Sequence, residues 1–258
     1  MEMKIKFFDS HSHYNDEKFD VDRENVLKEL YEEFINGAIC VGYGLESSKK
    51  AVELSTKYNW MYATCGISPN DLNENVENEI LEIEKMAIDY RIVAIGEIGL
   101  DYYWNKENKD KQKEVFIRQI EIANRLNLPI VIHTREAVMD TLNILKENEC
   151  IKKGVFHCCP LNIELVKEAL KLGYYISFSG NITFKNAKAD EVIKYVPLEK
   201  MLIETDCPYL SPEPNRGKRN TSANLKYIAE KIAQIKQITV EQVADITYKN
   251  ARKLFNIM

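Results

Sequence analysis

The chain lacks any run of eighteen apolar residues, and its sequence therefore predicts no helix that crosses a membrane. Its first residues, MEMKIKFFDSHSH, also lack the charged and then apolar layout of a secretory signal, so we expect a cytoplasmic protein. Basic residues are not in excess, since 35 lysines and arginines stand against 40 aspartates and glutamates, a net charge of −5. A protein that coats nucleic acid non-specifically is usually basic, and this balance argues against that role.

Cysteine is sparse and carries no metal motif, because none of the six cysteines forms a C-x-x-C pair. Most of them lie in apolar segments, where we expect small reduced side chains of the core. The chain also has no low-complexity tract, linker or heptad array. A hydrophobic fraction of 45% over 258 residues suits one folded α/β domain that spans residues 1–258.

One pattern repeats along the chain: a short apolar run, a turn and then an amphipathic helix. There are eight such runs, at Ile5–Phe8, Ala38–Val41, Met61–Ile67, Ile92–Ile95, Pro129–Ile132, Gly154–Phe156, Tyr174–Phe178 and Met201–Ile203. They are rich in β-branched and aromatic residues and are mostly continuous rather than alternating. This pattern is typical of parallel strands that are covered on both faces.

Apolar residues at helical spacing fill the segments between these runs. The clearest stripes lie in Val26–Phe34, Ile80–Ile88 and Lys113–Leu126, and another begins at Leu225. The last helix opens with a capping box, Thr239-x-x-Gln242. Eight strand–helix units in a chain of this length predict a closed (β/α)₈ barrel, also called a TIM barrel, with an additional C-terminal helix.

A doubly wound open sheet is the rival fold. It would usually carry a glycine-rich phosphate turn after the first strand, where this chain has the residues DSHSH instead. The pair Gly42-x-Gly44 after the second run lacks the third glycine of such a turn. The barrel is therefore the favoured fold.

Histidine is scarce, with four in the whole chain, and each one follows directly on an apolar run. They are His11, His13, His133 and His157. In a barrel the C-terminal ends of the strands meet at one end, which we call the mouth, and catalytic groups collect there. Two histidines one residue apart on a strand point to the same side, and two neutral imidazoles can hold one divalent ion.

Two carboxylates complete this group. Glu97 closes the fourth apolar run, and Asp206 follows the eighth. Each has an alternative role, as a hydrated rim residue for Glu97 and as a turn cap before Pro208 for Asp206. A charged group at the end of an apolar strand is costly unless water or a cation compensates it. Four imidazoles and two carboxylates suit two divalent ions, which can share a hydroxide and stabilise the attacking and leaving oxygens.

The order of short motifs resembles a known family, the TatD-like metal-dependent hydrolases. The motifs are DSHSH, GEIGLDYYW, PIVIHTRE, FHC, ISFSG, ETDCPYL and the loop RGKRN. They run along essentially the whole chain, and their ordered combination is far more specific than any one of them.

This resemblance implies a TIM barrel similar in fold to the amidohydrolases, with two divalent metal ions as cofactors. It places one ion on His11, His13, Glu97 and Asp206 and the second on Glu97, His133 and His157. Glu97 then bridges the two. Members of the family are described as deoxyribonucleases with 3′-to-5′ exonuclease activity and sometimes cleavage at abasic sites. The expected substrate is therefore DNA, with RNA as the alternative nucleic acid.

The chain departs from the family at one position. Many relatives carry a histidine in a Gly-x-His-Pro motif after the third strand, where this chain has Ser68. Serine is neither a cation nor a metal ligand of comparable strength. If that histidine contacts phosphate, this protein binds its substrate more weakly or differently, while the proposed metal ligands stay complete.

The expected catalytic residues are Glu97 and Asp206. Water between the two ions is acidified towards neutrality, and the resulting hydroxide attacks phosphorus. Asp206 is the candidate that orients this water or takes its proton, because a carboxylate beside a metal has a low pKa. Glu204, two residues earlier, faces the barrel interior or orients a ligand.

Residues near the mouth are candidates for substrate contact. For phosphate they are Arg135, Arg216, Lys218 and Arg219, because loops after the last strands of this fold often build phosphate sites. For stacking on unpaired bases they are Tyr102, Tyr103 and Trp104, which follow the fourth strand. A solvated basic loop and packing of the aromatic rings against the barrel are the alternatives.

The ligands alone do not separate a phosphodiesterase from a two-metal hydrolase of another ester or amide bond. The basic loop favours phosphate, and Ser68 slightly disfavours it. A non-catalytic binding protein is a third hypothesis, against which the six intact ligands argue. Imidazoles favour zinc, whereas carboxylates admit magnesium or manganese. The sequence predicts no protein partner, and a monomer is the default.

Overall fold

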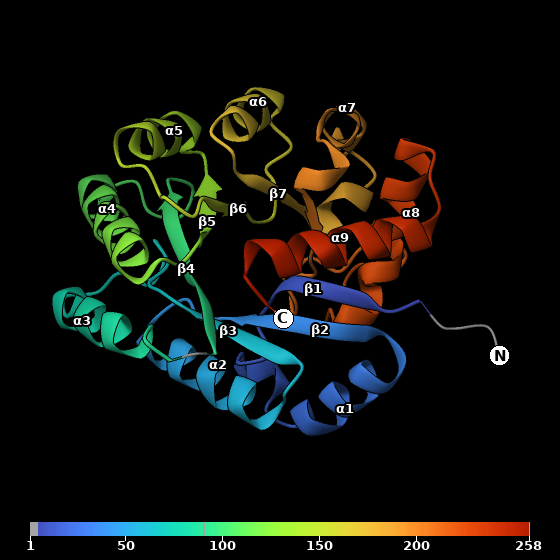
Figure 1. Ribbon diagram of the computed structural model, residues 1–258, viewed down its shortest axis with the longest axis horizontal. Coiled ribbons are helices and arrows are strands. Elements are labelled where there is room, and N and C mark those ends of the chain that lie inside the picture. The colour runs from blue at the N-terminus through green and yellow to red at the C-terminus, as the bar shows by residue number, and fades with distance from the viewer. Residues whose placement is uncertain (1–4, 90, 258) are drawn as a thin grey trace.

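A computed structural model describes residues 5–89 and 91–257, and it shows eight strands in one sheet (Figure 1). The strands are β1 (Phe7–Ser12), β2 (Ile35–Val41), β3 (Met61–Cys65), β4 (Ile92–Asp101), β5 (Ile130–Arg135), β6 (Gly154–Phe156), β7 (Tyr175–Phe178) and β8 (Met201–Ile203). They lie side by side in chain order, and all seven pairs are parallel. The predicted TIM barrel is confirmed.

The seam between β8 and β1 is joined through residues that follow β8. Thr205 donates its backbone N–H and its hydroxyl to the carboxyl group of Asp9, at 3.0 and 2.6 Å. The backbone of Asp206 donates to the carbonyl of His11 at 2.9 Å, and that of His13 donates to the carbonyl of Cys207 at 2.8 Å. These bonds bring the loop after β8 against the end of β1, where the predicted site begins.

Helices between the strands surround the sheet (Figure 1). They are α1 (Arg23–Glu33), α2 (Leu45–Lys57), α3 (Val76–Met86), α4 (Lys109–Leu126), α5 (Val138–Glu147), α6 (Ile163–Lys171), α7 (Ala189–Tyr195), α8 (Leu225–Lys236) and α9 (Val240–Leu254). Short 3-10 turns lie at Glu17–Phe19, Gly180–Thr183, Leu198–Lys200 and Ser222–Asn224. Within the described ranges, no helix is both long and apolar enough to cross a membrane.

Three strands extend further towards the mouth than their apolar runs predict. The run of the fourth strand ends at Ile95, yet β4 continues to Asp101, and β1 and β5 likewise continue into polar residues. The polar residues of these extensions are mostly buried, because they contact one another across the barrel instead of facing water. Glu97 therefore lies inside a strand, where its backbone is held rigidly.

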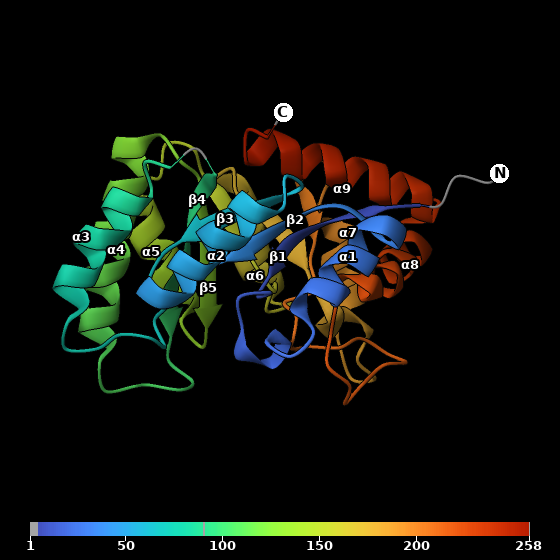
Figure 2. The same cartoon turned by 90° about the horizontal axis from the view of Figure 1, so that it is seen from below.

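The barrel interior is apolar at the end opposite the mouth. Side chains from several strands pack together there, among them those of Phe8, Ile39, Val131 and Leu202. Leu254 and Phe255, at the end of α9, pack into the same cluster. Figure 2 shows α9 along one side of the molecule and the longer loops at the other. The additional C-terminal helix thus closes the bottom of the barrel, and the mouth of the barrel is left open.

The capping box of α9 is confirmed. The Thr239 hydroxyl accepts from the backbone of Gln242 at 3.2 Å, and the Gln242 side chain accepts from the backbone of Thr239 at 2.9 Å. We expect Thr239→Ala to lower the free energy of unfolding by about 1 kcal/mol, because an N-cap acceptor is lost. Thermal unfolding followed by circular dichroism should show a melting temperature roughly 2–4 °C lower. Thr239→Ser is the control, and equal melting temperatures for all three proteins would contradict the prediction.

Candidate metal centre

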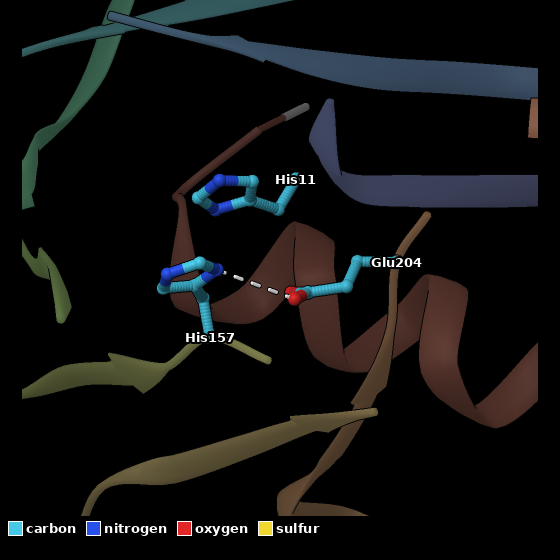
Figure 3. A group of neighbouring side chains, drawn as sticks. All are labelled: His11, His157 and Glu204. Carbon is cyan, nitrogen blue, oxygen red and sulfur yellow. Dashed lines mark ion pairs between the residues drawn. The ribbon is translucent and has the colours of Figure 1, made fainter. Parts of the chain in front are cut away.

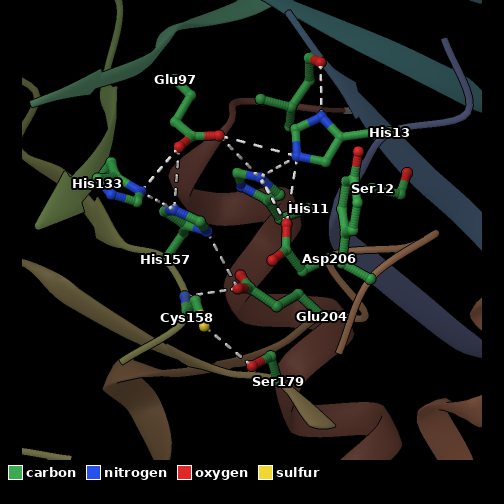
Figure 4. A network of polar contacts seen from close by, with 12 residues as sticks. His11, Ser12, His13, Glu97, His133, His157, Cys158, Ser179, Glu204 and Asp206 are labelled. Carbon is green, nitrogen blue, oxygen red and sulfur yellow. Dashed lines mark hydrogen bonds and ion pairs between the residues drawn. The ribbon is translucent and has the colours of Figure 1, made fainter. Parts of the chain in front are cut away.

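All six predicted ligands meet at the mouth of the barrel (Figure 4). They come from five strands or the residue positions just beyond them: His11 and His13 from β1, Glu97 from β4, His133 from β5, His157 after β6 and Asp206 after β8. Four of the six are less than 9% exposed, and His133 and Asp206 are partly buried. Side chains up to 195 positions apart in sequence are therefore neighbours in space.

The first group of ligand atoms lies around one oxygen of Glu97. The Nε2 atoms of His11 and His13 are 3.1 Å apart, and they lie 3.5 and 3.8 Å from Glu97 Oε2. Asp206 Oδ1 lies 3.5 Å from His11 Nε2 and 3.2 Å from His13 Nε2. Two nitrogens and two oxygens converge here, as the alternation of side chains along β1 predicts for the histidine pair.

The second group lies around the other oxygen of the same carboxylate. Glu97 Oε1 is 2.9 Å from His133 Nδ1 and 3.4 Å from His157 Nε2, and these two nitrogens are 3.2 Å apart. In each group, two ring nitrogens lie close to each other and to a carboxylate oxygen. Nitrogen and oxygen donors directed at a common point fit a divalent cation of the zinc or manganese kind. Each group can hold such an ion, and Glu97 belongs to both.

The conformation of the chain after β8 places Asp206. This residue has a φ of +55°, in the left-handed region that aspartate tolerates better than most residues. The seam bonds from Asp206 and His13 to neighbouring carbonyls hold the turn against β1. The Asp206 side chain consequently faces the two histidines of β1 instead of solvent.

Both carboxylates of the centre are held in the ionised form. Burial by itself raises the pKa of Glu97, but the surrounding imidazoles, His157 first among them, outweigh it and bring that pKa well below its usual range. Burial likewise opposes ionisation of Asp206, and the hydrogen bond with His13 lowers its pKa overall. For His11, burial and then the nearby charge of His157 lower the pKa, which favours the neutral imidazole that binds metals.

Two of the histidines have partners for the ring nitrogen that faces away from the ligand groups. His13 Nδ1 lies 3.1 Å from the carbonyl oxygen of Val41, and His133 Nε2 lies 2.9 Å from Asp101 Oδ2. Such outer hydrogen bonds set the orientation of a metal-binding imidazole. The sequence motifs did not point to Asp101, although its spacing of four residues from Glu97 on one strand places both side chains on the same face.

The structure brings Arg135 to the cavity at the mouth but places Tyr102 elsewhere. Tyr102 is 6% exposed, and its hydroxyl donates to Asp140 of α5 at 2.7 Å. Asp101 causes this, because its carboxylate accepts from the backbones of Tyr103 and Trp104 at 2.9 and 3.1 Å. The resulting turn directs Tyr102 into the protein and exposes the next two rings. Of the three rings expected to stack on bases, Tyr103 and Trp104 are therefore the two that are exposed.

The basic loop after β8 does not line the cavity either. The Arg216 guanidinium donates to the carbonyl of Ser211 at 3.0 Å and lies 3.8 Å from the Phe184 ring. Arg219 makes two bonds with the carboxylate of Asp22, at 2.8 and 2.6 Å. Lys218 is exposed on the same loop. Intramolecular partners therefore hold the two arginines outside the centre. The loop sequence alone does not reveal these partners.

A cavity of about 960 Å³ lies over the ligand groups. Among the described residues that line it, three carboxyl groups, those of Asp71, Glu97 and Asp206, stand against one guanidinium, that of Arg135. Ser68, at the position where the family histidine is expected, lines the same cavity. Three imidazoles, those of His13, His133 and His157, line it as well, and two bound divalent ions would add further positive charge.

Comparison with known proteins identifies the family of the chain. A family model described as TatD related DNase matches residues 8–256. The chain is 44% identical to the "Uncharacterized metal-dependent hydrolase YabD" of Bacillus subtilis, over 97% of this chain and 99% of that protein. It is 38% identical to the "Uncharacterized metal-dependent hydrolase YcfH" of Escherichia coli K12, over 96% of this chain and 95% of the relative.

Solved structures show the same likeness. YJJV, a TatD homolog from Escherichia coli K12, superposes with a TM-score of 0.93 at 25% identity, over 99% of this chain and 100% of that one. An organophosphorus hydrolase from Deinococcus radiodurans, with a TM-score of 0.69 at 13% identity and coverage of 97% and 93%, shares the fold. The chain belongs to the TatD-related DNase family of metal-dependent hydrolases.

Proposed function

We propose that the protein is a two-metal deoxyribonuclease that hydrolyses phosphodiester bonds at the end of a DNA strand. One observation supports this most directly: the two oxygens of Glu97 face different groups of ligand atoms, one with His11 and His13 and one with His133 and His157. A carboxylate shared in this way suits a pair of ions. Paired ions are a common arrangement for in-line displacement at phosphorus.

The ions, when bound, acidify water and stabilise charge on the attacking and leaving oxygens. The residues of this chain supply the rest. Glu97 keeps the two groups together, and Asp206, with its lowered pKa, orients the attacking water or accepts its proton. The site is largely screened from bulk solvent, since Glu97, His13 and His157 are less than 9% exposed. Charge interactions there are correspondingly strong.

The cavity favours an anionic substrate that is narrow enough to enter it. Arg135 is the one arginine or lysine among the described residues that line it, so we infer that substrate binding depends on the ions more than on basic side chains. Because the ligand atoms lie at the bottom of the cavity, a single-stranded end reaches them more readily than the backbone of an intact duplex. This supports exonuclease action, for which the family resemblance implies a 3′-to-5′ direction.

A cluster at the rim of the cavity suits an unpaired base. The Arg135 guanidinium lies 3.8 Å from the centroid of the Tyr103 ring and 5.4 Å from that of Trp104. The two rings meet edge to face at 4.8 Å, and Trp104 is 68% exposed. An exposed aromatic ring beside a cation is a usual platform for bases and their phosphates. We therefore assign the predicted phosphate contact to Arg135 and the stacking contact to Trp104.

We expect Trp104→Ala to reduce kcat/KM for a short single-stranded DNA by roughly 5- to 150-fold, because base stacking contributes about 1–3 kcal/mol. The loss should appear mainly in KM, since Trp104 is not among the ligand atoms. Trp104→Phe keeps a stacking surface and should retain most of the affinity. Exposure of the ring means that neither variant should lose stability. Unchanged kinetics for the alanine variant would contradict the assignment of the stacking contact to Trp104.

The function itself is tested with purified protein and short single-stranded DNA labelled at either end, with Mg²⁺, Mn²⁺ or Zn²⁺ and with chelator. We expect metal-dependent shortening from the 3′ end. Strands of RNA and duplexes with an abasic site extend the same assay to the other expected substrates. Absence of cleavage, together with turnover of a carboxylic ester or amide, would instead support a hydrolase of another bond.

Other expectations from the sequence remain proposals. Arg216, Lys218 and Arg219 are exposed and would reach only a strand that extends beyond the cavity. All six cysteines are free, which suits the proposed cytoplasmic location. A monomer stays the expected oligomeric state.

A further inference from the structure

A carboxyl group outside the six ligands lies directly beneath them. Glu204 follows β8, is fully buried and faces His11 and His157 from within the barrel (Figure 3). A ligand atom from each of these three residues lies within 4.8 Å of the other two. The two imidazoles are stacked, with ring centroids 4.0 Å apart and an interplanar angle of 10°. One carboxyl group therefore faces a histidine from each group of ligand atoms.

Only one of the two carboxylate oxygens of Glu204 has a hydrogen-bond partner. Its Oε1 accepts from the backbone N–H of Cys158 at 2.6 Å and lies 3.4 Å from His157 Nδ1. Its Oε2 is buried without a hydrogen-bond partner, and so is His11 Nδ1. A buried polar atom without a partner is costly. An unpaired acceptor and an unpaired ring nitrogen in one small space are natural partners for each other.

Binding of ions determines where the protons of these rings lie. The Nε2 atoms of His11 and His157 point at Glu97, so a cation held there would occupy the lone pair of Nε2. A neutral imidazole then carries its proton on Nδ1, which becomes a donor. His13 and His133 already have separate acceptors, Val41 and Asp101. For the Nδ1 atoms of His11 and His157, the nearby acceptor among the described residues is the carboxylate of Glu204.

We propose that Glu204 is a positioning residue that orients one histidine of each ion site and so links the affinities of the two ions. This rests on the two-ion site proposed above. Its carboxylate accepts from Nδ1 of both rings as well as from Cys158, which directs both Nε2 lone pairs at the ions. A third cation on the Nδ1 atoms is the less favourable arrangement, because each imidazole would have to lose its last proton.

The linkage is tested by titrating metal-free protein with Zn²⁺ against a competing chelator, without nucleic acid. Glu204→Gln keeps the shape but replaces one acceptor with a donor, so it cannot accept from both rings. We expect both dissociation constants to rise, by roughly 10- to 100-fold each. Asp101→Asn is the matched control, because His133 is the only one of the four histidines with which Asp101 is hydrogen-bonded. That variant should weaken one ion and leave the other near its wild-type affinity.

The proton positions are tested in the wild-type protein, which keeps the proposal falsifiable if Glu204→Gln fails to fold. The chain has only four histidines, so ¹⁵N-labelled imidazoles give a simple NMR spectrum. In the Zn²⁺-loaded protein we expect Nδ1–H on His11, His13 and His157 and Nε2–H on His133. In Glu204→Gln the signals of His11 and His157 should shift or broaden together.

Each outcome decides a separate point. An unprotonated Nδ1 on either His11 or His157, or unchanged affinities for both ions in Glu204→Gln, would overturn the role of Glu204. Three Zn²⁺ ions in the wild type and two in Glu204→Gln would make Glu204 a ligand and overturn it as well. A wild-type stoichiometry of one ion would contradict the two-ion site itself. Failure to cleave DNA touches neither measurement, so the nuclease proposal and this one fail independently.

Discussion

Replacing Glu97 with alanine should abolish hydrolysis while the barrel stays folded. Glu97 is the one described residue with an oxygen facing each of the two groups of ligand atoms, so its loss would remove a ligand from both proposed ion sites. A pair of ions stabilises the transition state by several kcal/mol, and each 1.4 kcal/mol changes a rate about tenfold. We therefore expect kcat/KM to fall by about a thousandfold or more.

The fold should survive this change because the backbone of Glu97 keeps its 2.7 Å bond to the carbonyl of Gly42. Circular dichroism and the melting temperature of the metal-free proteins check this. Glu136→Ala is the matched control, since Glu136 is an exposed carboxylate on the loop after β5 that pairs with Lys106. It should retain wild-type activity. Full activity of Glu97→Ala with any of the tested metals would rule out the bridging role.

Removal of metal should destabilise the protein as well as inactivate it. A ligand that binds only the folded state stabilises it by about 2.7–4.1 kcal/mol at 100 to 1,000 times its dissociation constant. For a chain of this size, chelation should therefore lower the melting temperature by roughly 5–15 °C. The physical cause is local: without a cation, the ring nitrogens of His11 and His13 face each other at 3.1 Å.

Differential scanning fluorimetry with and without chelator measures this effect, and added Mn²⁺ or Zn²⁺ should restore both stability and activity. The Glu97→Ala variant is the control, because its melting temperature should respond much less to metal. If the melting temperature of the wild type were the same with chelator as with saturating metal, the cation site would be contradicted. Stabilisation by metal without turnover of any substrate would instead favour a binding protein that keeps the barrel.

These experiments separate the three functions that the ligands alone leave open. Metal binding tests the centre, cleavage of DNA tests the phosphodiesterase, and turnover of an ester or amide tests the alternative bond. Membership of the family establishes a metal-dependent hydrolase. The cavity adds a reason to expect an anionic substrate, because bound divalent ions would add positive charge to a lining that includes Arg135.

Much of the fold followed from local sequence patterns. Continuous apolar runs predicted the strands because both faces of a parallel sheet are covered, and that pattern is set residue by residue. The ends of the strands were predicted less well: β4 continues to Asp101 because its polar residues find partners inside the protein. An apolar run ends where the ligands begin, so hydrophobicity marks the strands only up to the site.

The sequence by itself determined the barrel, the family and the six residues at the strand ends, because strand order converts positions along the chain into positions around one rim. Only the tertiary structure decided which side chains serve the centre from a distance. Asp101, Glu204 and Trp104 are brought to it, whereas Tyr102 and Arg219 are held away by Asp140 and Asp22. These outcomes depend on partners far away in the chain, and no local pattern specifies which partner a polar side chain will contact.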